Sequence, residues 1–291
     1  MPNFDKFYIG GKWVEPTGTE VLDVYSPATE ELVGQVPVST TADMDAAVQA
    51  AKDAFELGPW RNTTPEERAE VITKISQGIT ARMDEFATLI TQQNGAPFVF
   101  SQMGQVYAAT AILDQFATVV REYQFEQTRT GLLGNAIVRR EPVGVCAGII
   151  PWNVPLFITA LKLGPALASG STIVIKPAPE TPLDSYLLAE VLEEAGVPAG
   201  VVNIVAADRE VGEHLVRHPD IDKVSFTGST AAGRKIGAIA GEQLKRVTLE
   251  LGGKSAAIIL DDANLDETLP TLMPFALMNN GQACVAQTRI L

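Results

Sequence analysis

The stretch Gly144-Val145-Cys146-Ala147-Gly148-Ile149-Ile150 decides the fold that this sequence predicts. It is a continuous apolar run, typical of a strand buried on both faces of a parallel sheet. Similar runs follow at Ser171–Lys176, Gly200–Val205, Lys223–Phe226 and Val247–Leu251. The helical patterns between them cover Phe157–Leu167, Leu183–Glu194, Arg209–His218 and Ala231–Ala240. This alternation predicts an α/β fold with a doubly wound parallel sheet, whose ligand lies at the carboxyl ends of the strands.

The glycine signals fit a nucleotide site only in part. No Gly-x-Gly-x-x-Gly follows the first strand, and the nearest glycine turn is Phe226-Thr227-Gly228-Ser229-Thr230-Ala231-Ala232-Gly233. Free amides around Ser229 and Thr230 would face a pyrophosphate at the start of the next helix. An ordinary helix start, capped by a Ser or Thr side chain, explains the same residues. A Rossmann-like, nucleotide-binding architecture remains the leading interpretation of the alternation as a whole.

The residues before this alternation predict a β-hairpin region followed by helices. Short strands broken by turns are expected within residues 7–38. Helices are expected at Thr41–Phe55, from Thr64 onward, at Met83–Gln93 and, as one long helix, at Phe98–Phe125. Residues 126–145 are polar and alternating, which predicts an exposed hairpin.

One cysteine lies in a polar turn near the end of the sequence. Cys284 stands within Met278-Asn279-Asn280-Gly281-Gln282-Ala283-Cys284-Val285, directly after the apolar run Leu272–Leu277. Such a turn suits a thiol held at a cleft, and a thiolate near neutral pH attacks carbonyl carbons well. Free cysteines are also commonly small buried hydrophobes, and the turn alone leaves that alternative open.

A carboxylate precedes this cysteine at the end of the last predicted strand. Glu250 stands among β-formers and leucines just before a Gly-Gly pair. We expect it to have little solvation, which would raise its pKa toward the range of a general base. An ion pair with Lys245, Arg246 or Lys254 is the alternative.

Together these motifs resemble the aldehyde dehydrogenase superfamily. Glu250-Leu251-Gly252-Gly253-Lys254 and Gly281-Gln282-Ala283-Cys284 are similar to its glutamate and cysteine signatures. Gly148-Ile149-Ile150-Pro151-Trp152-Asn153-Val154-Pro155 resembles its strand-end motif, and Ile175-Lys176-Pro177-Ala178-Pro179-Glu180-Thr181-Pro182 its adenosine-ribose contact. Gly212 matches a glycine that lies near the cofactor in relatives.

The resemblance implies a hydrolytic, NAD(P)-dependent oxidation of an aldehyde. The Cys284 thiolate would attack the aldehyde, and the Asn153 amide and the Cys284 N–H would hold the oxyanion of the thiohemiacetal. Hydride transfer would leave a thioester, which water activated by Glu250 would hydrolyse. The presence of Glu250 favours hydrolysis over transfer to coenzyme A. For Asn153, the alternative is a cap for the following helix.

The resemblance also implies which residues contact the cofactor. They are Ile149, Ile150, Pro151, Trp152, Asn153, Lys176, Pro179, Gly212, Gly228, Ser229, Gly233, Glu250, Leu251 and Gly252. Lys176 would donate hydrogen bonds to the ribose hydroxyls. NAD-preferring relatives often carry a glutamate where Pro179 stands, so exclusion of NADP is weakened and NADP stays possible. NAD is favoured because we expect no arginine or additional lysine beside this site to attract the 2′-phosphate.

Charge and cysteine usage exclude other classes. With 22 basic and 35 acidic residues the formal charge is −13, which disfavours a nucleic-acid partner. No run of about 18 apolar residues is present for a membrane span, and the N-terminus lacks an export signal, so we expect a cytoplasmic protein. Cys146 and Cys284 give no metal spacing. His214 and His218 are expected to be solvated surface histidines.

The resemblance divides the chain. Residues 1–125 and 146–250 would form the NAD(P)-binding domain, and residues 126–145 a protruding hairpin that assembles a homodimer or homotetramer in the complete protein. Residues 251–291 would begin a second, α/β catalytic domain. Members of the family continue beyond the cysteine, so we expect a fragment, a truncated gene product or part of a split protein. The alternative function is therefore a non-catalytic nucleotide-binding fragment, prone to aggregation.

The expected substrate is a small aldehyde. The helix after Asn153 offers Val154, Phe157, Ile158 and Leu161, which indicate an apolar tunnel. Such a tunnel favours aliphatic or aromatic aldehydes over charged ones.

Overall fold

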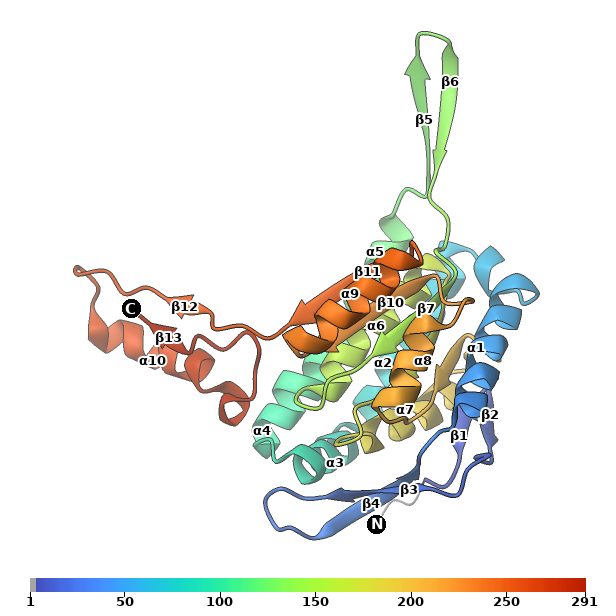
Figure 1. The fold of residues 1–291 in the computed structure, drawn as a ribbon. Helices are drawn as coiled ribbons and strands as arrows, with labels where there is room; N and C mark the ends of the chain where they lie inside the picture. The colour runs from blue at the N-terminus through green and yellow to red at the C-terminus, as the bar shows by residue number, and fades with distance from the viewer. Residues whose placement is uncertain (1–3) are drawn as a thin grey trace.

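A seven-stranded sheet forms the centre of the computed structural model, which describes residues 4–291 (Figure 1). The strand order is β11-β10-β7-β8-β9-β1-β2. The parallel strands are β7 (Val145–Ile149), β8 (Thr172–Lys176), β9 (Val202–Ile204), β10 (Lys223–Gly228) and β11 (Arg246–Leu251). The sheet extends from β7 in both directions, so the crevice of the switch point lies between the ends of β7 and β10. The predicted doubly wound α/β fold is confirmed.

Helices cover both faces of this sheet. Helices α6 (Pro155–Ser169) and α7 (Leu183–Glu194) connect β7 to β8 and β8 to β9. Helices α8 (Arg209–Arg217) and α9 (Thr230–Glu242) return the chain across the other face, where α1 (Thr41–Glu56) packs beside α8. Helices α2 (Pro65–Ala81), α3 (Met83–Asn94) and α5 (Ala108–Glu122) pack outside α6 and α7.

The helix starts follow from local sequence. Thr40 and Asp43 form a reciprocal capping box at α1, and Thr64 and Glu67 form another at α2. Pro65 occupies the first turn of α2, where its missing N–H costs no hydrogen bond. The short 3₁₀ turn Trp60–Asn62 connects α1 to α2.

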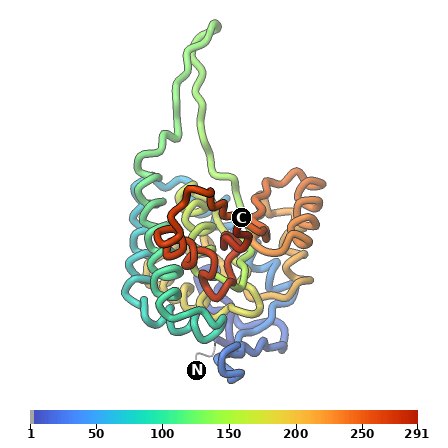
Figure 2. Tube along the Cα trace, turned by 90° about the vertical axis from the view of Figure 1, so that its left-hand side faces the viewer, coloured from blue at the N-terminus to red at the C-terminus, as the bar shows by residue number. Residues whose placement is uncertain are grey.

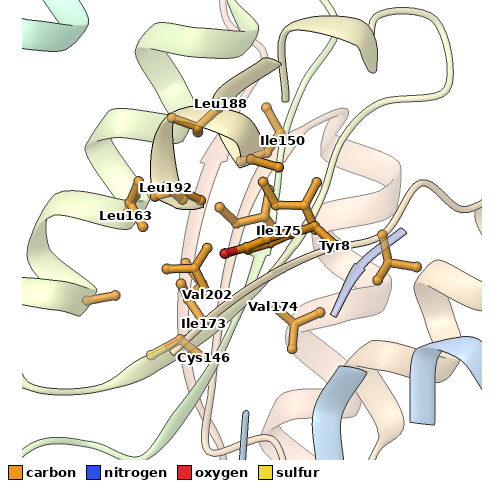
Figure 3. Packing of buried hydrophobic residues seen from close by; sticks show 14 of the residues in the cluster. Tyr8, Cys146, Ile150, Leu163, Ile173, Val174, Ile175, Leu188, Leu192 and Val202 are labelled. Atoms are coloured by element: carbon orange, nitrogen blue, oxygen red, sulfur yellow. The ribbon is translucent and has the colours of Figure 1, made fainter. Parts of the chain in front are cut away.

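The core forms around β7 and β8, in which every residue is buried. Figure 3 shows Ile173, Val174 and Ile175 of β8 among side chains from the neighbouring helices and strands, including Leu188. Burying one such aliphatic side chain contributes roughly 1.5–3 kcal/mol. This packing fixes the strand ends that carry the site.

The strands expected within residues 7–38 are present, and the structure adds which sheet each of them joins. Strands β1 (Phe7–Ile9) and β2 (Lys12–Val14) join the edge of the main sheet through β9, antiparallel to it. Strands β3 (Val21–Tyr25) and β4 (Leu32–Pro37) pair only with each other within the described chain. The predicted strands are present, but their sequence carried no signal for which sheet they join.

The expected single helix over Phe98–Phe125 differs from the structure. Helix α4 (Phe98–Phe100) passes into a π-helix, η2 (Ser101–Tyr107), before α5 begins. A Cβ on Gly104 would lie 2.7 Å from the Phe100 ring, so this glycine lets the ring pack against the widened turn. Single widened turns of this kind occur often at functional sites.

Strands β5 (Glu126–Gly131) and β6 (Gly134–Arg139) form a hairpin that projects from the body (Figures 1 and 2). Leu132 and Leu133 at its tip are fully exposed. The structure matches the exposed hairpin expected over residues 126–145.

Residues 251–291 stand to one side of the body in Figure 1, and in Figure 2, which is viewed from that side, they lie in front of it. They contain β12 (Ala256–Ala257), α10 (Leu265–Ala276), the 3₁₀ turn η3 (Met278–Gly281) and β13 (Arg289–Ile290). Strands β12 and β13 pair in parallel, apart from the main sheet. Within residues 4–291, no helix is long and apolar enough to cross a bilayer.

Candidate active site

A cavity of about 580 Å³ opens at the carboxyl ends of the parallel strands, beside α8 and α9. Ligands of doubly wound sheets bind at this edge. The predicted cofactor residues that line it are Ile149, Lys176, Pro179, Gly212 and Ser229. We call it the cofactor cavity.

Lys176 and Gly212 fit each other inside this cavity. Lys176 is 6% exposed, and its Nζ donates to the Pro177 carbonyl at 3.1 Å. A Cβ at position 212 would lie 3.1 Å from the Lys176 Cε, so any larger residue there would press on this side chain. Burial lowers the pKa of Lys176 to about 8, against the raising effect of the Glu180 and Asp208 carboxylates. A ligand hydroxyl that accepts from Nζ would compensate for that burial.

The N-terminus of α9 is capped by an ordinary side-chain hydrogen bond, and it also faces the cofactor cavity. The Ser229 Oγ accepts from the Ala232 N–H at 3.2 Å, as the capping alternative required. A helix start leaves several N–H groups without intrahelical partners, and one cap satisfies only one of them. Because Ser229, Ala231 and Ala232 line the cavity, the remaining amides are placed for an anion.

The other predicted cofactor residues lie outside the lining of this cavity. Gly233 allows α9 to pack closely against Leu251 of β11, since a Cβ at position 233 would lie 2.4 Å from the Leu251 side chain. Gly228 lies against the Phe226 ring in the same way. The residues Ile150, Pro151, Trp152, Asn153, Glu250, Leu251 and Gly252 also do not line it.

Two basic residues correct the expectation that no arginine or additional lysine adjoins the cofactor site. Arg209 and Lys235 both line the cofactor cavity. Lys235 forms an ion pair with Glu213, whereas Arg209 has no ion pair within residues 4–291. The sequence motifs missed both because α8 and α9 bring them to the cavity from positions far from Lys176.

A second cavity, of about 540 Å³, contains both reactive candidates. Cys284 and Glu250 line it together with Val154, Phe157, Ile158 and Leu161, the side chains expected to form an apolar tunnel. We call it the thiol cavity. Ile149 lines the cofactor cavity and Val154 lines the thiol cavity, so one short loop joins the two.

Cys284 is the accessible thiol of the chain. It is partly exposed, in the turn that follows η3. Cys146 is buried in β7, and burial raises the pKa of its thiol to about 11. The alternative of a buried hydrophobe therefore applies to Cys146, and a reactive thiolate is favoured only at Cys284.

Glu250 lies in β11 next to its end, as predicted, but its expected desolvation is wrong. The residue is exposed, because the face of the edge strand β11 that carries Thr248 and Glu250 is not covered by packed side chains. The ion-pair alternative also fails within residues 4–291. Lys245 donates to the Val216 and His218 carbonyls instead, and no ion pair involves Glu250.

Asn153 does not itself line the thiol cavity, but it is hydrogen-bonded to the turn that carries the cysteine. It does not cap α6, whose start at Val154 has no side-chain cap. Its Nδ2 donates to the Gln282 carbonyl at 2.7 Å, and its own carbonyl accepts from Asn94 and Asn279. An amide nitrogen carries two hydrogens, so one remains for an oxyanion.

Lys162 is a site residue that the sequence reasoning missed. It lines the thiol cavity, and its Nζ donates to Ser225 Oγ at 3.1 Å and Thr227 Oγ1 at 2.9 Å. Burial lowers its pKa to about 8, while the Glu250 carboxylate acts in the opposite direction. A lysine within the apolar run of α6 was the available signal, because a buried charge requires polar partners.

The histidines are not simply solvated, contrary to expectation. His214 Nε2 contacts Asp45 Oδ1 at 2.5 Å, and His218 Nε2 lies 3.4 Å from the same oxygen. Burial lowers the pKa of His218, against the effect of Asp45. The described part of the chain contains no cluster of three or more His, Cys, Asp or Glu residues suited to a metal.

The doubly wound fold and the cavity at its strand ends are typical of an α/β protein of the nucleotide-binding class, and the second cavity holds a thiol. The sequence profile of the aldehyde dehydrogenase family matches residues 13–291. The chain belongs to the aldehyde dehydrogenase family, which confirms the resemblance seen in its motifs.

Individual relatives agree with this assignment. The chain is 43% identical over 285 residues to geranial dehydrogenase of Castellaniella defragrans, covering 98% of this chain and 60% of that protein. It is 40% identical over 289 residues to phenylacetaldehyde dehydrogenase of Pseudomonas fluorescens, covering 97% and 58%. The chain thus spans about 60% of the length of the relatives that it matches.

Solved structures show the same fold. The Mycobacterium tuberculosis aldehyde dehydrogenase complexed with NAD+ superposes with a TM-score of 0.97 at 47% identity, covering 99% of this chain and 60% of that one. A mutant of aldehyde dehydrogenase C from Pseudomonas syringae, complexed with NAD+ and octanal, gives 0.94 at 40% identity, covering 99% and 58%.

Proposed function

We propose that this chain carries the cofactor site and the nucleophile of an enzyme that oxidises an aldehyde to a carboxylic acid with NAD. One observation carries the proposal: Cys284 and Glu250 share the thiol cavity, and the loop from Ile149 to Val154 joins it to the cofactor cavity. This arrangement supports a nucleophile, a base and a nucleotide site that lie next to one another. The relatives solved with NAD+ support this cofactor.

In the cofactor cavity, Lys176 would donate to the ribose hydroxyls, and the amides at the start of α9 would face the pyrophosphate. Bound NAD supplies the hydride acceptor. Pro179 has no charge to repel a 2′-phosphate, and Arg209 attracts one, so NADP is included as a second cofactor.

In the thiol cavity, the Cys284 sulfur bonds to the aldehyde carbon while the carbonyl oxygen takes up the electron pair. The free Asn153 amide hydrogen and the Cys284 N–H stabilise that oxyanion, and each such donor is commonly worth about 2.7–4 kcal/mol. Loss of hydride from the same carbon leaves a thioester on Cys284.

Glu250 completes the proposed cycle. Its exposed carboxylate takes a proton from water as the water oxygen bonds to the thioester carbon. The carbon–sulfur bond then breaks, which releases the carboxylic acid and regenerates the Cys284 thiolate. Exposure of Glu250 gives this water direct access.

The walls of the thiol cavity indicate the substrate class. Val154, Phe157 and Leu161 are apolar, so an aliphatic or aromatic aldehyde fits better than a charged one. Octanal in the complex of the Pseudomonas syringae relative supports an aliphatic chain.

The same proposal covers organisation and location. Residues 1–125 and 146–250 form the NAD(P)-binding domain, residues 126–145 the hairpin through which homodimers or homotetramers assemble, and residues 251–291 the beginning of the catalytic domain. A cytoplasmic location fits a cysteine nucleophile that must stay reduced.

Formation of reduced nicotinamide by the 291-residue chain, with octanal and NAD or NADP, tests the proposal. We expect turnover that disappears in Cys284→Ala and persists in Cys146→Ala, since Cys146 is buried away from the cavities. Turnover that survives Cys284→Ala contradicts the assigned nucleophile. NAD binding without turnover would instead support the non-catalytic nucleotide-binding alternative.

A further inference from the structure

We propose that Asn94 and Asn279 are positioning residues that hold Asn153 and the Cys284 turn in a fixed mutual arrangement. The inference rests on the proposed function, because it concerns the same nucleophile and the same oxyanion donor. Neither asparagine lines the thiol cavity, and both bond to backbone groups of Asn153 and the adjoining turns, so we assign them a positioning role and no contact to the substrate.

Asn94 is fixed at both ends of its side chain. It is the last residue of α3 and is 5% exposed. Its Oδ1 accepts from the Ala96 N–H at 2.9 Å, and its Nδ2 donates to the Asn153 carbonyl at 3.1 Å. The turn at the end of α3 thereby fixes the backbone of Asn153.

Asn279, in the turn before Cys284, donates a hydrogen bond to the same Asn153 carbonyl. It is 3% exposed, and its Nδ2 donates to Asn153 O at 3.0 Å and, more weakly, to Gln282 O at 3.4 Å. Its φ of 51° lies in the left-handed region, which asparagine tolerates better than most residues. The side chain is thus placed by a backbone conformation that few replacements accept.

The Asn153 side chain in turn donates a hydrogen bond to the cysteine turn. Its Nδ2 donates to the Gln282 carbonyl at 2.7 Å, two residues before Cys284. Asn280 adds a bond from its Nδ2 to the Gly95 carbonyl at 3.0 Å. These bonds form a closed ring that runs from the end of α3 through Asn153 to the cysteine turn and back.

Hydrogen bonds rather than apolar packing must fix this turn. Asn279 is the only buried residue between Leu277 and Val285 in the described structure. Buried amide hydrogen bonds are directional, so they set the orientation of the free Asn153 hydrogen relative to the thiol. A small displacement of reacting groups lowers rates by up to about 10²-fold.

Isosteric Asn→Asp variants test the ring, because each puts an oxygen where a nitrogen now donates. In Asn94→Asp and Asn279→Asp this oxygen faces the Asn153 carbonyl, and repulsion opens the ring. Asn264→Asp is the matched control, since the Asn264 oxygen accepts from the Asp266 N–H as an N-cap and aspartate caps equally well.

Two readouts separate positioning from a merely structural role. The first is kcat per reactive Cys284 thiol, with the thiols titrated by iodoacetamide. The second is the alkylation rate of Cys284 at fixed pH, which needs no turnover. We expect kcat per thiol to fall about tenfold or more in both variants, with KM for NAD within about twofold of wild type. We expect the alkylation rate to change by at least about threefold.

A lower melting temperature with unchanged kcat per thiol and unchanged alkylation rate would overturn the proposal. If the parent chain lacks turnover, the proposed function fails, but the alkylation rate still decides the positioning role. Should Asn279→Asp not fold, Asn280→Gly replaces it. Asn280 is exposed, glycine accepts its φ of 58°, and only the bond to Gly95 is lost. An alkylation rate equal to wild type in this variant and in Asn94→Asp would also overturn the ring.

Discussion

Residues 4–250 and residues 251–291 are stabilised in different ways. The whole buried apolar cluster belongs to the first region. In the second, only Leu272, Ala276, Asn279 and Ala286 are buried, while Phe275 and Val285 are 51% and 61% exposed. The cofactor cavity is built by the first region alone, whereas the thiol cavity needs both. Nucleotide binding and thiol chemistry therefore depend on different physical supports.

The largest expected difference is in stability. Leu188 of α7 is 1% exposed and Leu269 of α10 is 44% exposed, so Leu→Ala at each removes the same atoms from opposite environments. We expect Leu188→Ala to lower the free energy of unfolding by about 2–5 kcal/mol, measured by urea denaturation. Leu269→Ala should change it by less than about 0.5 kcal/mol. Equal losses would show that the second region is packed as tightly as the first.

This contrast also explains what the sequence predicted well. Helix α7 covers Leu183–Glu194, as expected, because its apolar spacing and neighbouring strand runs agree with one another. The strand ends that carry Ile149 and Lys176 follow from the same apolar runs. Within the first region, local pattern and tertiary packing favour the same structure.

The features that the sequence did not predict depend on tertiary contacts between segments far apart in the chain. Glu250 stands in a strand, but whether its side chain is solvated depends on what covers β11, which the strand sequence does not encode. Arg209, Lys235 and Lys162 reach the cavities from helices, at positions outside the motifs. The ring through Asn94 and Asn279 joins segments far apart in the chain.

A second prediction concerns a buried carboxyl group, and it sharpens the comparison between the packed first region and the exposed second one. Asp184 is fully buried, accepts from Gln93 at 2.7 Å, and burial raises its pKa from 3.8 to about 7. Between about pH 4 and pH 7 the folded protein keeps this proton while the unfolded chain releases it, so stability falls as pH rises through that window. We expect Asp184→Asn to remove about 1–3 kcal/mol of that fall.

Urea midpoints at about pH 5 and pH 7.5 measure this effect. Asp266→Asn on α10 is the matched control, because Asp266 is exposed and its loss should leave the pH dependence as in the parent chain. A parent protein with no fall between the two pH values, or a fall that Asp184→Asn retains, would contradict a buried, protonated Asp184.

A third prediction concerns the cofactor cavity. In Gly212→Ala the new Cβ presses on the Lys176 side chain, so we expect the dissociation constant of NAD to rise about tenfold, or about 1.4 kcal/mol. Alkylation of Cys284 should not change, because residue 212 belongs to the other cavity. Gly241→Ala in α9 is the control, as nothing lies within 4 Å of its added Cβ. Calorimetric titration that gives equal affinities for the two variants would contradict this role of Gly212.

The smallest effect separates the two cofactors. Arg209 lines the cofactor cavity and is exposed, so its attraction for a 2′-phosphate is screened and worth at most about 1 kcal/mol. We expect Arg209→Gln to raise the dissociation constant of NADP by up to about fivefold and to leave that of NAD unchanged. Arg234→Gln is the control, because Arg234 is exposed on α9 but does not line the cavity. Both affinities are measured by fluorescence titration at low and high salt, and only the NADP difference should shrink as salt increases. Equal weakening of NAD and NADP would mean that Arg209 contacts a part common to both cofactors, and the tolerance for NADP would then rest on Pro179 alone.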